Sequence, residues 1–584
     1  MTPDTERSRG PTRPSAKRLR TGSVSRVTSF SGNTGLSGHT RLSGHAGAHA
    51  VAVAQRYGVT TMFTLSGGHV FPLYDGAVKA DPPLRLVDVR HEQTAAFAAE
   101  GSARLTRVPG LAVVTAGPGI TNTISGVTSA WFNGAPVVIL GGRAPDYLWG
   151  KGALQEMDHV PLLKPITKHA WTVHETSRVA FSVDEAFRMA LTPHRGPVFC
   201  DFPMEAIYGE ASVELSGAPL SRPSEAAAGD VDRIAALLAV ARRPVLVLGS
   251  DVWLGRAEAA ARGCAETLRL PVLANGQGRG ILPRGHDLLL TRARAQALAE
   301  ADLVIVAGVR LDFRLRYGSF GPKDAPAHVV HVADSPAGIA AHCPLAASAA
   351  GDLAAFFTAL TDACGARPQG DPEWLPRLQD TARASAAADT ALLASQADPV
   401  HPMRVYGELL KTLDDDAVVI GDGGDFVSFA GRLVEPALPG RWLDPGPYGC
   451  LGTGLGYAMA ARLAHPAPQV VLLLGDGAAG LSLMDADTLV RHNLPVVMIV
   501  GNNSAWGLEK EPMRAVYGYD VAADLGPRTR YDEVVRALGG AGELVTTPDQ
   551  LAPALKRAFA ASVPYLINVI TDGSAAYPRT TTGV

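Results

Sequence analysis

The sequence predicts an α/β protein built from three doubly wound, parallel-sheet domains. Short, continuous apolar runs rich in β-branched residues recur along the chain with helical stretches between them, which is typical of parallel strands covered by helices on both faces. The runs fall into three sets. A chain of 584 residues also has room for roughly three to five domains of about 100–200 residues.

The three sets of runs mark the expected domains. The first set lies at 60–65, 111–116 and 135–140; the second at 244–250, 271–276, 302–308 and 328–334; the third at 416–424, 469–477, 494–503 and 564–572. Polar connections rich in Ala, Pro and Gly separate the sets near 208–230 and 365–398. We therefore expect an N-terminal domain at 45–207, a Rossmann-like central domain at 230–364 and a C-terminal domain at 398–575.

Residues 1–44 differ from the rest of the chain. They are rich in Arg, Ser, Thr, Gly and Pro and contain few apolar residues, so they cannot bury enough surface to fold, and we expect a disordered basic tail. Their composition also resembles an organelle transit peptide. The simpler interpretation is a non-functional extension or a misplaced start site. The Ala, Gly and Arg usage of the whole chain favours a bacterial, cytoplasmic protein.

Composition excludes several classes of protein. The chain has 53 basic and 56 acidic residues, which argues against a basic nucleic-acid binder. It has no apolar run of about 18 residues, so we expect no membrane-spanning helix. The five cysteines form no CxxC pair, which indicates neither a disulfide framework nor a structural zinc site.

One pattern in the third set indicates a metal site. Gly475, Asp476 and Gly477 follow one predicted strand, and Asn503 follows the next, 27 positions after the aspartate. Because neighbouring parallel strands end at the same sheet edge, the two polar side chains can converge there. Carboxylate and amide oxygens suit Mg²⁺ holding a diphosphate, and glycines let the backbone approach phosphate closely. A lone Gly-Asp-Gly can equally be a tight turn, and the chain has a second one at 421–423.

The first set contains two further motifs. The segment RHEQT at 90–94 opens a helix, and TAGPGITN follows at 115–122. These segments and the 475–503 pattern, in this order, resemble the acetolactate synthase-like family of thiamine diphosphate (ThDP) enzymes. The resemblance extends from about 45 to 575. It implies a pyrimidine-binding N-terminal domain and a diphosphate-binding C-terminal domain.

The resemblance also implies roles for particular residues. Glu92 would hydrogen-bond the pyrimidine of ThDP and promote removal of the thiazolium C2 proton. Leu451 would force the cofactor to bend, and the Gly449 carbonyl would accept from its amino group. The Ala505 carbonyl would join Asp476 and Asn503 as a metal ligand. Further cofactor contacts would come from Gly423, Gly424, Gly475 and Gly477. Glu92 would face the metal site across a subunit boundary, which implies a homodimer or homotetramer.

Four residues are expected in the substrate pocket: Gly68, His69, Gln155 and Trp506. Here the sequence departs from the acetolactate synthase pattern, because WGLEKEP at 506–512 stands where a segment resembling GMVRQWQ is expected, and Met204 stands in place of a lysine. The segment 291–318 instead resembles 2-hydroxyacyl-CoA lyases and oxalyl-CoA decarboxylases, although Asp485 stands where those relatives tend to have Glu.

The preferred function is acetolactate synthase-like: pyruvate is decarboxylated and the two-carbon unit is joined to a second 2-ketoacid, as in branched-chain amino acid biosynthesis. The alternative is a 2-hydroxyacyl-CoA lyase or oxalyl-CoA decarboxylase type of enzyme, which affinity for CoA would reveal. A redox variant would need FAD, and a non-catalytic ThDP-binding protein would lack Glu92. A dinucleotide dehydrogenase would need a glycine fingerprint that is missing here.

The central domain of this family holds FAD, ADP or nothing. Arg294 and Arg310 are the candidate nucleotide contacts in this sequence.

Overall fold

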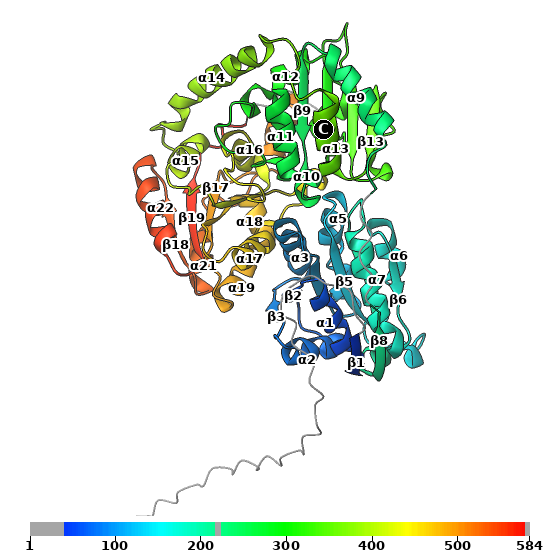
Figure 1. The fold of residues 1–584 in the computed structure, drawn as a ribbon. Helices are drawn as coiled ribbons and strands as arrows, with labels where there is room; N and C mark the ends of the chain where they lie inside the picture. The colour runs from blue at the N-terminus through cyan, green and yellow to red at the C-terminus, as the bar shows by residue number, and fades with distance from the viewer. Residues whose placement is uncertain (1–39, 217–223, 578–584) are drawn as a thin grey trace, which may run out of the picture. The chain divides into compact units, whose positions relative to one another are not determined.

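The computed structural model describes residues 40–216 and 224–577. It contains three parallel sheets, one for each set of apolar runs, with helices packed on their faces (Figure 1). This confirms the predicted fold class. Among the described residues, no helix combines the length and apolarity that crossing a membrane requires.

The N-terminal sheet has six strands in the order β3-β2-β4-β5-β7-β6. Its strands are β2 (Thr61–Thr64), β3 (Arg85–Asp88), β4 (Gly110–Val114), β5 (Val137–Arg143), β6 (Ala170–Thr172) and β7 (Val198–Pro203). Its helices are α1 (Ala46–Arg56), α2 (Phe71–Lys79), α3 (Glu92–Thr106), α4 (Pro118–Thr121), α5 (Ile124–Phe132), α6 (Val160–Leu163), α7 (Val179–Leu191) and α8 (Met204–Tyr208).

The central sheet has five strands in the order β10-β9-β11-β12-β13. They are β9 (Pro244–Leu248), β10 (Val272–Ala274), β11 (Leu303–Ala307), β12 (His328–Ala333) and β13 (Ala347–Ala350). The accompanying helices are α9 (Ala228–Val240), α10 (Ser250–Leu254), α11 (Glu258–Leu268), α12 (Arg294–Glu300) and α13 (Leu353–Ala363).

The C-terminal sheet has six strands in the order β15-β14-β16-β17-β19-β18. They are β14 (Val418–Asp422), β15 (Trp442–Leu443), β16 (Val470–Gly475), β17 (Val497–Asn502), β18 (Ala541–Val545) and β19 (Tyr565–Ile570). Its helices are α15 (Pro402–Leu409), α16 (Gly424–Leu433), α17 (Gly454–Ala464), α18 (Asp476–Ser482), α19 (Ala486–Arg491), α20 (Gly507–Tyr517), α21 (Tyr531–Ala537) and α22 (Leu551–Ala560).

Every apolar run named above forms a strand, because each run is long enough and apolar enough to be buried on both sheet faces. Two segments differ from expectation. Helix α14 (Trp374–Leu393) lies inside the second expected connection, where Trp374 and Leu378 are buried against the central domain. Strand β1 (Thr40–His45) includes the last residues of the expected tail and pairs antiparallel with β8 (Glu210–Leu215).

In strand β1, side chains point alternately to the two faces, which buries Leu42 opposite Val213 of β8. This contact stabilises the strand. The remainder of the expected tail, 1–39, lies outside the described residues. The domain boundaries 45–207, 230–364 and 398–575 stay predictions.

The N-terminal and C-terminal domains share one apolar core in which α3 packs on α17. Two glycines allow the close approach. A methyl group on Gly456 would come within 2.9 Å of the Ala98 backbone nitrogen, and one on Gly101 within 3.0 Å of the Tyr457 ring. The helix that begins at Glu92 is therefore held directly against the C-terminal domain of the same chain.

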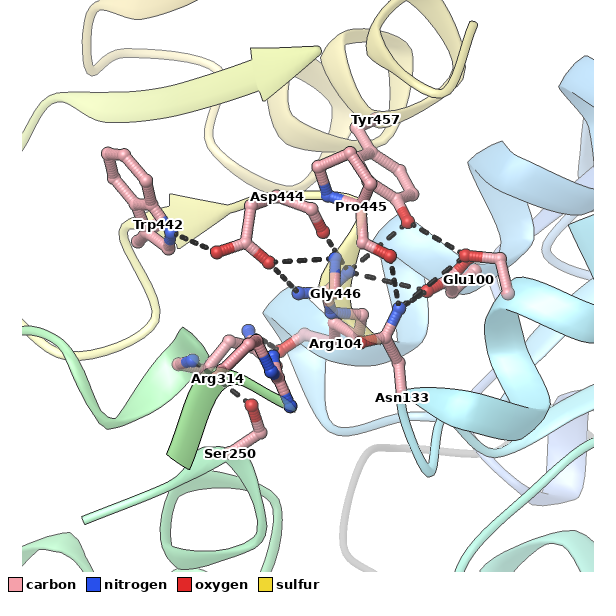
Figure 2. A network of polar contacts seen from close by, with 12 residues as sticks. Glu100, Arg104, Asn133, Ser250, Arg314, Trp442, Asp444, Pro445, Gly446 and Tyr457 are labelled. Carbon is pink, nitrogen blue, oxygen red and sulfur yellow. Dashed lines mark hydrogen bonds and ion pairs between the residues drawn. The ribbon is translucent and has the colours of Figure 1, made fainter. Parts of the chain in front are cut away.

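The three domains meet at Arg104, near the end of α3 (Figure 2). Its buried guanidinium donates to the carbonyl oxygen of Asp444 at 2.9 Å and to the hydroxyl of Tyr457 at 3.2 Å, both in the C-terminal domain. Its carbonyl oxygen accepts from the indole of Trp253 at 2.7 Å, in the central domain. Glu100, one turn earlier, pairs with the guanidinium and so balances a charge that would be costly to bury alone.

Candidate active site

The expected metal site lies at the carboxyl edge of the C-terminal sheet. Strands β16 and β17 are neighbours, with Gly475 opposite Gly501 in the ladder, so Asp476 and Asn503 leave the sheet side by side. Both residues line one cavity of about 330 Å³, together with Ala505, Trp506 and Glu509. The structure thus brings together the three residues that the sequence analysis named as metal ligands.

One carboxylate oxygen of Asp476 is buried without a hydrogen-bond partner among the described residues. Its Oδ1 accepts from the backbone nitrogen of Gly477 at 3.0 Å, whereas its buried Oδ2 has no hydrogen-bond partner among the described residues. Burial is the largest influence on this group and raises the pKa of Asp476 to about 6. A buried carboxylate oxygen without a partner is costly unless a cation or a donor satisfies it, and an oxygen donor set of this kind suits Mg²⁺.

The glycines around this site form a close-packed cradle. Gly423 (φ 66°) and Gly424 (φ 79°) adopt the left-handed backbone that favours glycine. A methyl group on Gly475 would lie 3.5 Å from the Gly423 carbonyl oxygen, so the two glycine turns are adjacent. Helix α16 begins at Gly424, where its first backbone N–H groups are available to an anion.

The second Gly-Asp-Gly turn holds the loop that carries Leu451. Asp422, fully buried at the end of β14, accepts from the backbone nitrogens of Gly452 at 3.0 Å and Gly454 at 2.8 Å. Leu451 packs on the Gly423 backbone, because a methyl group on that glycine would come within 2.0 Å of a Leu451 methyl. Gly449 (φ 73°) makes the turn before this loop.

Glu92 is the first residue of α3 and is only 7% exposed. Its Oε2 accepts from the side-chain amide of Asn122 at 2.9 Å. The loop that leads to Asn122 is itself fixed, because the backbone nitrogen of Gly117 donates to Nε2 of His159 at 3.0 Å. Asp201 holds the other ring nitrogen of this histidine at 2.7 Å, which orients the ring.

The turn containing Glu92 lies beside the Leu451 loop within one chain. A methyl group on Gly452 would lie 3.6 Å from the side-chain amide of Gln93. The Cys450 thiol donates to the Ser125 carbonyl oxygen at 3.7 Å. Burial raises the pKa of that thiol, which agrees with an unreactive cysteine. The expectation that Glu92 faces the metal site of another subunit stays a prediction.

Two of the expected substrate residues are joined through Thr115. Its hydroxyl lies 3.1 Å from Nδ1 of His69 and 3.4 Å from Oε1 of Gln155. Burial lowers the pKa of His69, which favours the neutral ring. The Gly68 carbonyl oxygen accepts from the hydroxyl of Tyr208 at 2.6 Å.

Trp506 lies elsewhere, against the metal-site turn. A methyl group on Gly477 would meet its indole ring at 2.4 Å.

A second cavity, of about 370 Å³, lies at the carboxyl edge of the central sheet. Arg310 and Arg314 line it, and so do His194 and Asp251. Arg294 is not among the lining residues; its guanidinium donates to the Asn275 side chain at 3.1 Å and to the Arg314 carbonyl oxygen at 3.3 Å. Of the two expected nucleotide contacts, the structure therefore places only Arg310 at the cavity.

Sequence reasoning assigned no individual role to several residues that hold this site: Thr115, Asn122, Asp422 and Asp485. Thr115 and Asn122 belong to the TAGPGITN motif at 115–122, and membership of that motif is the only sequence signal for them. Asp422 was visible only as part of the repeated Gly-Asp-Gly. Asp485 stands out in the sequence only as a position where the lyase relatives tend to have Glu, and nothing in its spacing points to a function.

Three family models match the chain in the order expected. They are the thiamine pyrophosphate enzyme N-terminal TPP binding domain at residues 45–162, the central domain at 231–360 and the C-terminal TPP binding domain at 422–569. Thiamine pyrophosphate is another name for ThDP.

Curated relatives extend over nearly the whole chain. The acetolactate synthase large subunit IlvG of Mycobacterium tuberculosis is 50% identical over 527 residues, which is 89% of this chain and 95% of the relative. A probable acetolactate synthase of Mycobacterium bovis has the same identity and coverage. The human 2-hydroxyacyl-CoA lyase 2 is 33% identical over 544 residues, covering 86% of this chain and 85% of the relative.

Proposed function

This chain belongs to the thiamine pyrophosphate-dependent enzymes and is homologous to acetolactate synthase, and we propose that it decarboxylates pyruvate and joins the two-carbon unit to a second 2-ketoacid. This is the reaction type of branched-chain amino acid biosynthesis. The observation that carries the proposal is the unsatisfied, buried Oδ2 of Asp476 beside Asn503. The greater identity to the mycobacterial synthases favours this reaction over the lyase reaction.

The residues present fit ThDP and Mg²⁺. Asp476, Asn503 and the Ala505 carbonyl would hold the metal, which would satisfy the free carboxylate oxygen. Gly424 and Gly475 leave room for a diphosphate, because a methyl group on either would meet no atom closer than 3.5 Å. Gly423 and Gly477 would contact it through their backbones, since they pack against Leu451 and Trp506. When bound, ThDP supplies a carbon nucleophile that adds to a 2-ketoacid carbonyl and accepts the electron pair released with CO₂.

Glu92 is the proposed acid–base residue. Its carboxyl group would share a proton with N1′ of the pyrimidine ring, and the Asn122 amide would keep that carboxyl in place. Leu451, which packs on Gly423, would contact the cofactor and keep it bent. The bonds from Gly452 and Gly454 to Asp422 hold the Leu451 loop in place. The Gly449 carbonyl would accept from the cofactor's amino group.

The substrate pocket is proposed to include Gly68, His69 and Gln155, the last two linked by Thr115. A neutral His69 can donate to a substrate oxygen from the ring nitrogen that Thr115 does not occupy. Trp506 packs on the metal-site turn and would border the same reaction space from the C-terminal domain. His69 and Trp506 would together determine which 2-ketoacid can act as the acceptor.

The central cavity is a proposed site for FAD or ADP, with Arg310 as the phosphate contact. Arg314 lines the same cavity. We also propose a homodimer or homotetramer. Large apolar side chains that follow one another on the surface support it: Val516, Tyr517, Tyr519 and Val521, each at least 60% exposed.

Two parallel assays test the reaction. Purified protein with ThDP and Mg²⁺ receives pyruvate in one, assayed for acetolactate, and a 2-hydroxyacyl-CoA in the other, assayed for formyl-CoA. Glu92→Gln is the control for both. We expect acetolactate from the native enzyme and none above background from the variant. Cleavage of the CoA ester without consumption of pyruvate would assign the protein to the lyase reaction instead.

A further inference from the structure

Asp485 is a buried carboxylate of the C-terminal domain whose main partners belong to the N-terminal domain. It ends the short 3-10 helix Leu483–Asp485 and is 2% exposed. Its Oδ1 accepts from the backbone nitrogen of Arg90 at 2.7 Å, and its Oδ2 accepts from the hydroxyl of Thr94 at 2.7 Å. Both oxygens are therefore engaged across the domain boundary.

These two bonds straddle Glu92. Arg90 precedes it by two residues and Thr94 follows it by two, in the first turn of α3. Thr488, one turn after Asp485, adds a third link because its hydroxyl donates to the carbonyl oxygen of Asp88 at 3.2 Å and also contacts Asp485. The backbone on both sides of Glu92 is thus fixed to the C-terminal domain, while Asn122 fixes its carboxyl group.

Other links across this boundary are of a different kind. Arg491 pairs with Asp88 at 2.7 Å, but both side chains are at least one-third exposed. Exposed pairs contribute little, about 0–1 kcal/mol. Bonds from a buried carboxylate to two donors are stronger and have defined directions. The buried Asp485 bonds are therefore better suited than the exposed Arg491 contacts to set the position of the turn.

We propose that Asp485 is the positioning residue of the acid–base centre: its carboxylate fixes the first turn of α3 so that the Glu92 carboxyl meets the cofactor pyrimidine. This proposal rests on the proposed function of Glu92. It assigns no bond between Asp485 and substrate or cofactor. Burial raises the pKa of Asp485, but the three hydrogen bonds that it accepts from Arg90, Thr94 and Thr488 suit the ionised form.

The test measures proton removal rather than overall turnover. Holoenzyme with ThDP and Mg²⁺ is mixed with D₂O and quenched with acid, and exchange of the cofactor C2 proton is followed by ¹H NMR. Asp485→Ala removes both bonds. Thr94→Val removes one bond and keeps the shape of the side chain, so it serves if the alanine variant does not fold. Loss of a partner that orients a functional group costs about 10–100-fold, and we expect slower exchange in that range for Asp485→Ala and about 10-fold for Thr94→Val.

Two matched variants keep the test specific. Thr94→Ser retains the hydroxyl and should exchange the proton at close to the native rate. Arg491→Ala breaks the exposed cross-domain pair and the Arg491 contacts with the Asp88 carbonyl oxygen and the Thr488 hydroxyl. It leaves both Asp485 bonds to Arg90 and Thr94 in place, and its rate should stay within about twofold of native. The affinity for ThDP should be unchanged in all four variants, because the diphosphate is held elsewhere.

The outcomes are distinct. Slow exchange in Thr94→Val with native cofactor affinity and melting temperature, restored in Thr94→Ser, supports the proposal. A native exchange rate in folded Thr94→Val overturns it, as does a loss of rate that follows a matching loss of cofactor affinity or of melting temperature. If the native enzyme itself fails to exchange the proton, the proposed function fails, and this inference fails with it.

Discussion

Two Gly-Asp-Gly turns, at 421–423 and 475–477, follow neighbouring strands of the same sheet, yet their aspartates are satisfied in opposite ways. Asp422 is enclosed, and its two carboxylate oxygens accept from Gly452 and Gly454. Asp476 keeps a buried Oδ2 without a partner among the described residues. One turn uses its carboxylate to hold the protein together, and the other leaves an oxygen for a ligand.

The difference comes from what lies above each turn. The loop 449–454 folds over Asp422 and presents its backbone N–H groups, and this makes the carboxylate a structural acceptor. Over Asp476 there is a cavity bordered by Asn503 and Ala505. The Gly-Asp-Gly tripeptide does not itself determine whether its carboxylate is satisfied by protein or left for a ligand. That depends on whether a neighbouring loop supplies N–H donors, as 449–454 does for Asp422. If the two carboxylates have separate roles, substitutions of Asp422 and Asp476 should have opposite effects on stability and cofactor affinity.

The largest effect should come from Asp476→Ala. Removing a desolvated charge from its partner costs roughly 3–5 kcal/mol, so affinity for ThDP with Mg²⁺ should fall by about 100-fold or more, and turnover should vanish. The apo-protein should lose only about 1–3 kcal/mol of unfolding free energy, since the Gly477 N–H alone loses its acceptor and Oδ2 has no partner among the described residues. Calorimetric titration and chemical denaturation measure the two quantities.

Native cofactor affinity in folded Asp476→Ala would contradict the assignment of this turn as the open one.

Asp422→Ala should show the reverse pattern. It leaves the buried N–H groups of Gly452 and Gly454 without acceptors, at about 1–3 kcal/mol each. We expect the apo-protein to be destabilised by about 2–5 kcal/mol, measured by urea denaturation without cofactor. The matched control is Asp476→Ala under the same conditions. Equal destabilisation by both variants would remove the distinction between the two turns.

Two glycine substitutions compare how tightly the backbone of each turn is packed. Gly423→Ala places a methyl group 2.0 Å from Leu451 at a φ of 66°, whereas Gly475→Ala meets nothing closer than 3.5 Å at a φ of −75°. Strained backbone of this kind costs about 1–3 kcal/mol. The melting temperature should therefore fall for Gly423→Ala and change little for Gly475→Ala. A larger fall for Gly475→Ala would show that the Leu451 contact is not the tight one.

Much of this organisation is predictable from the sequence. The apolar runs predict the strands that lead to His69, Thr115, Asp476 and Asn503, because fully buried parallel strands have continuous apolar sequences. They do not include β3, the partly exposed strand before Glu92. The 27-residue spacing predicts that Asp476 and Asn503 share a sheet edge, and they line one cavity.

The remainder depends on tertiary contacts that leave no local pattern. Asp485 acquires its partners only when η10, the 3-10 helix Leu483–Asp485, packs on the turn before α3, and these residues are almost 400 positions apart. Arg294 is of a residue type that often binds phosphate, yet its guanidinium donates to the Asn275 side chain and to the Arg314 carbonyl oxygen. Strands β6 and β15 are too short, at three and two residues, to produce a periodic signal.

The remaining expected effect concerns the protonation of Asp422. Burial, the largest influence, raises its pKa from 3.8 to about 7, against the opposing pull of the Gly454 and Gly452 N–H groups. The folded chain then binds this proton more tightly than the unfolded chain. Its contribution to stability is fully present below about pH 4 and is lost as the pH rises to about 7, with a slope of at most about 1.4 kcal/mol per pH unit.

Subtracting the unfolding free energy of Asp422→Asn from that of the native apo-protein, pH by pH, isolates this contribution, because Asp476 and every other titrating group are common to both proteins. The difference should decline between about pH 4 and 7 and be flat above. A difference that is flat from pH 5 to 8 would mean that the carboxylate is already ionised at pH 5. The backbone N–H groups would then outweigh burial, and the enclosed turn would hold its loop with a full negative charge. A rise with pH would mean that those bonds depress the pKa outright, which would make Asp422 the stronger anchor of the Leu451 loop.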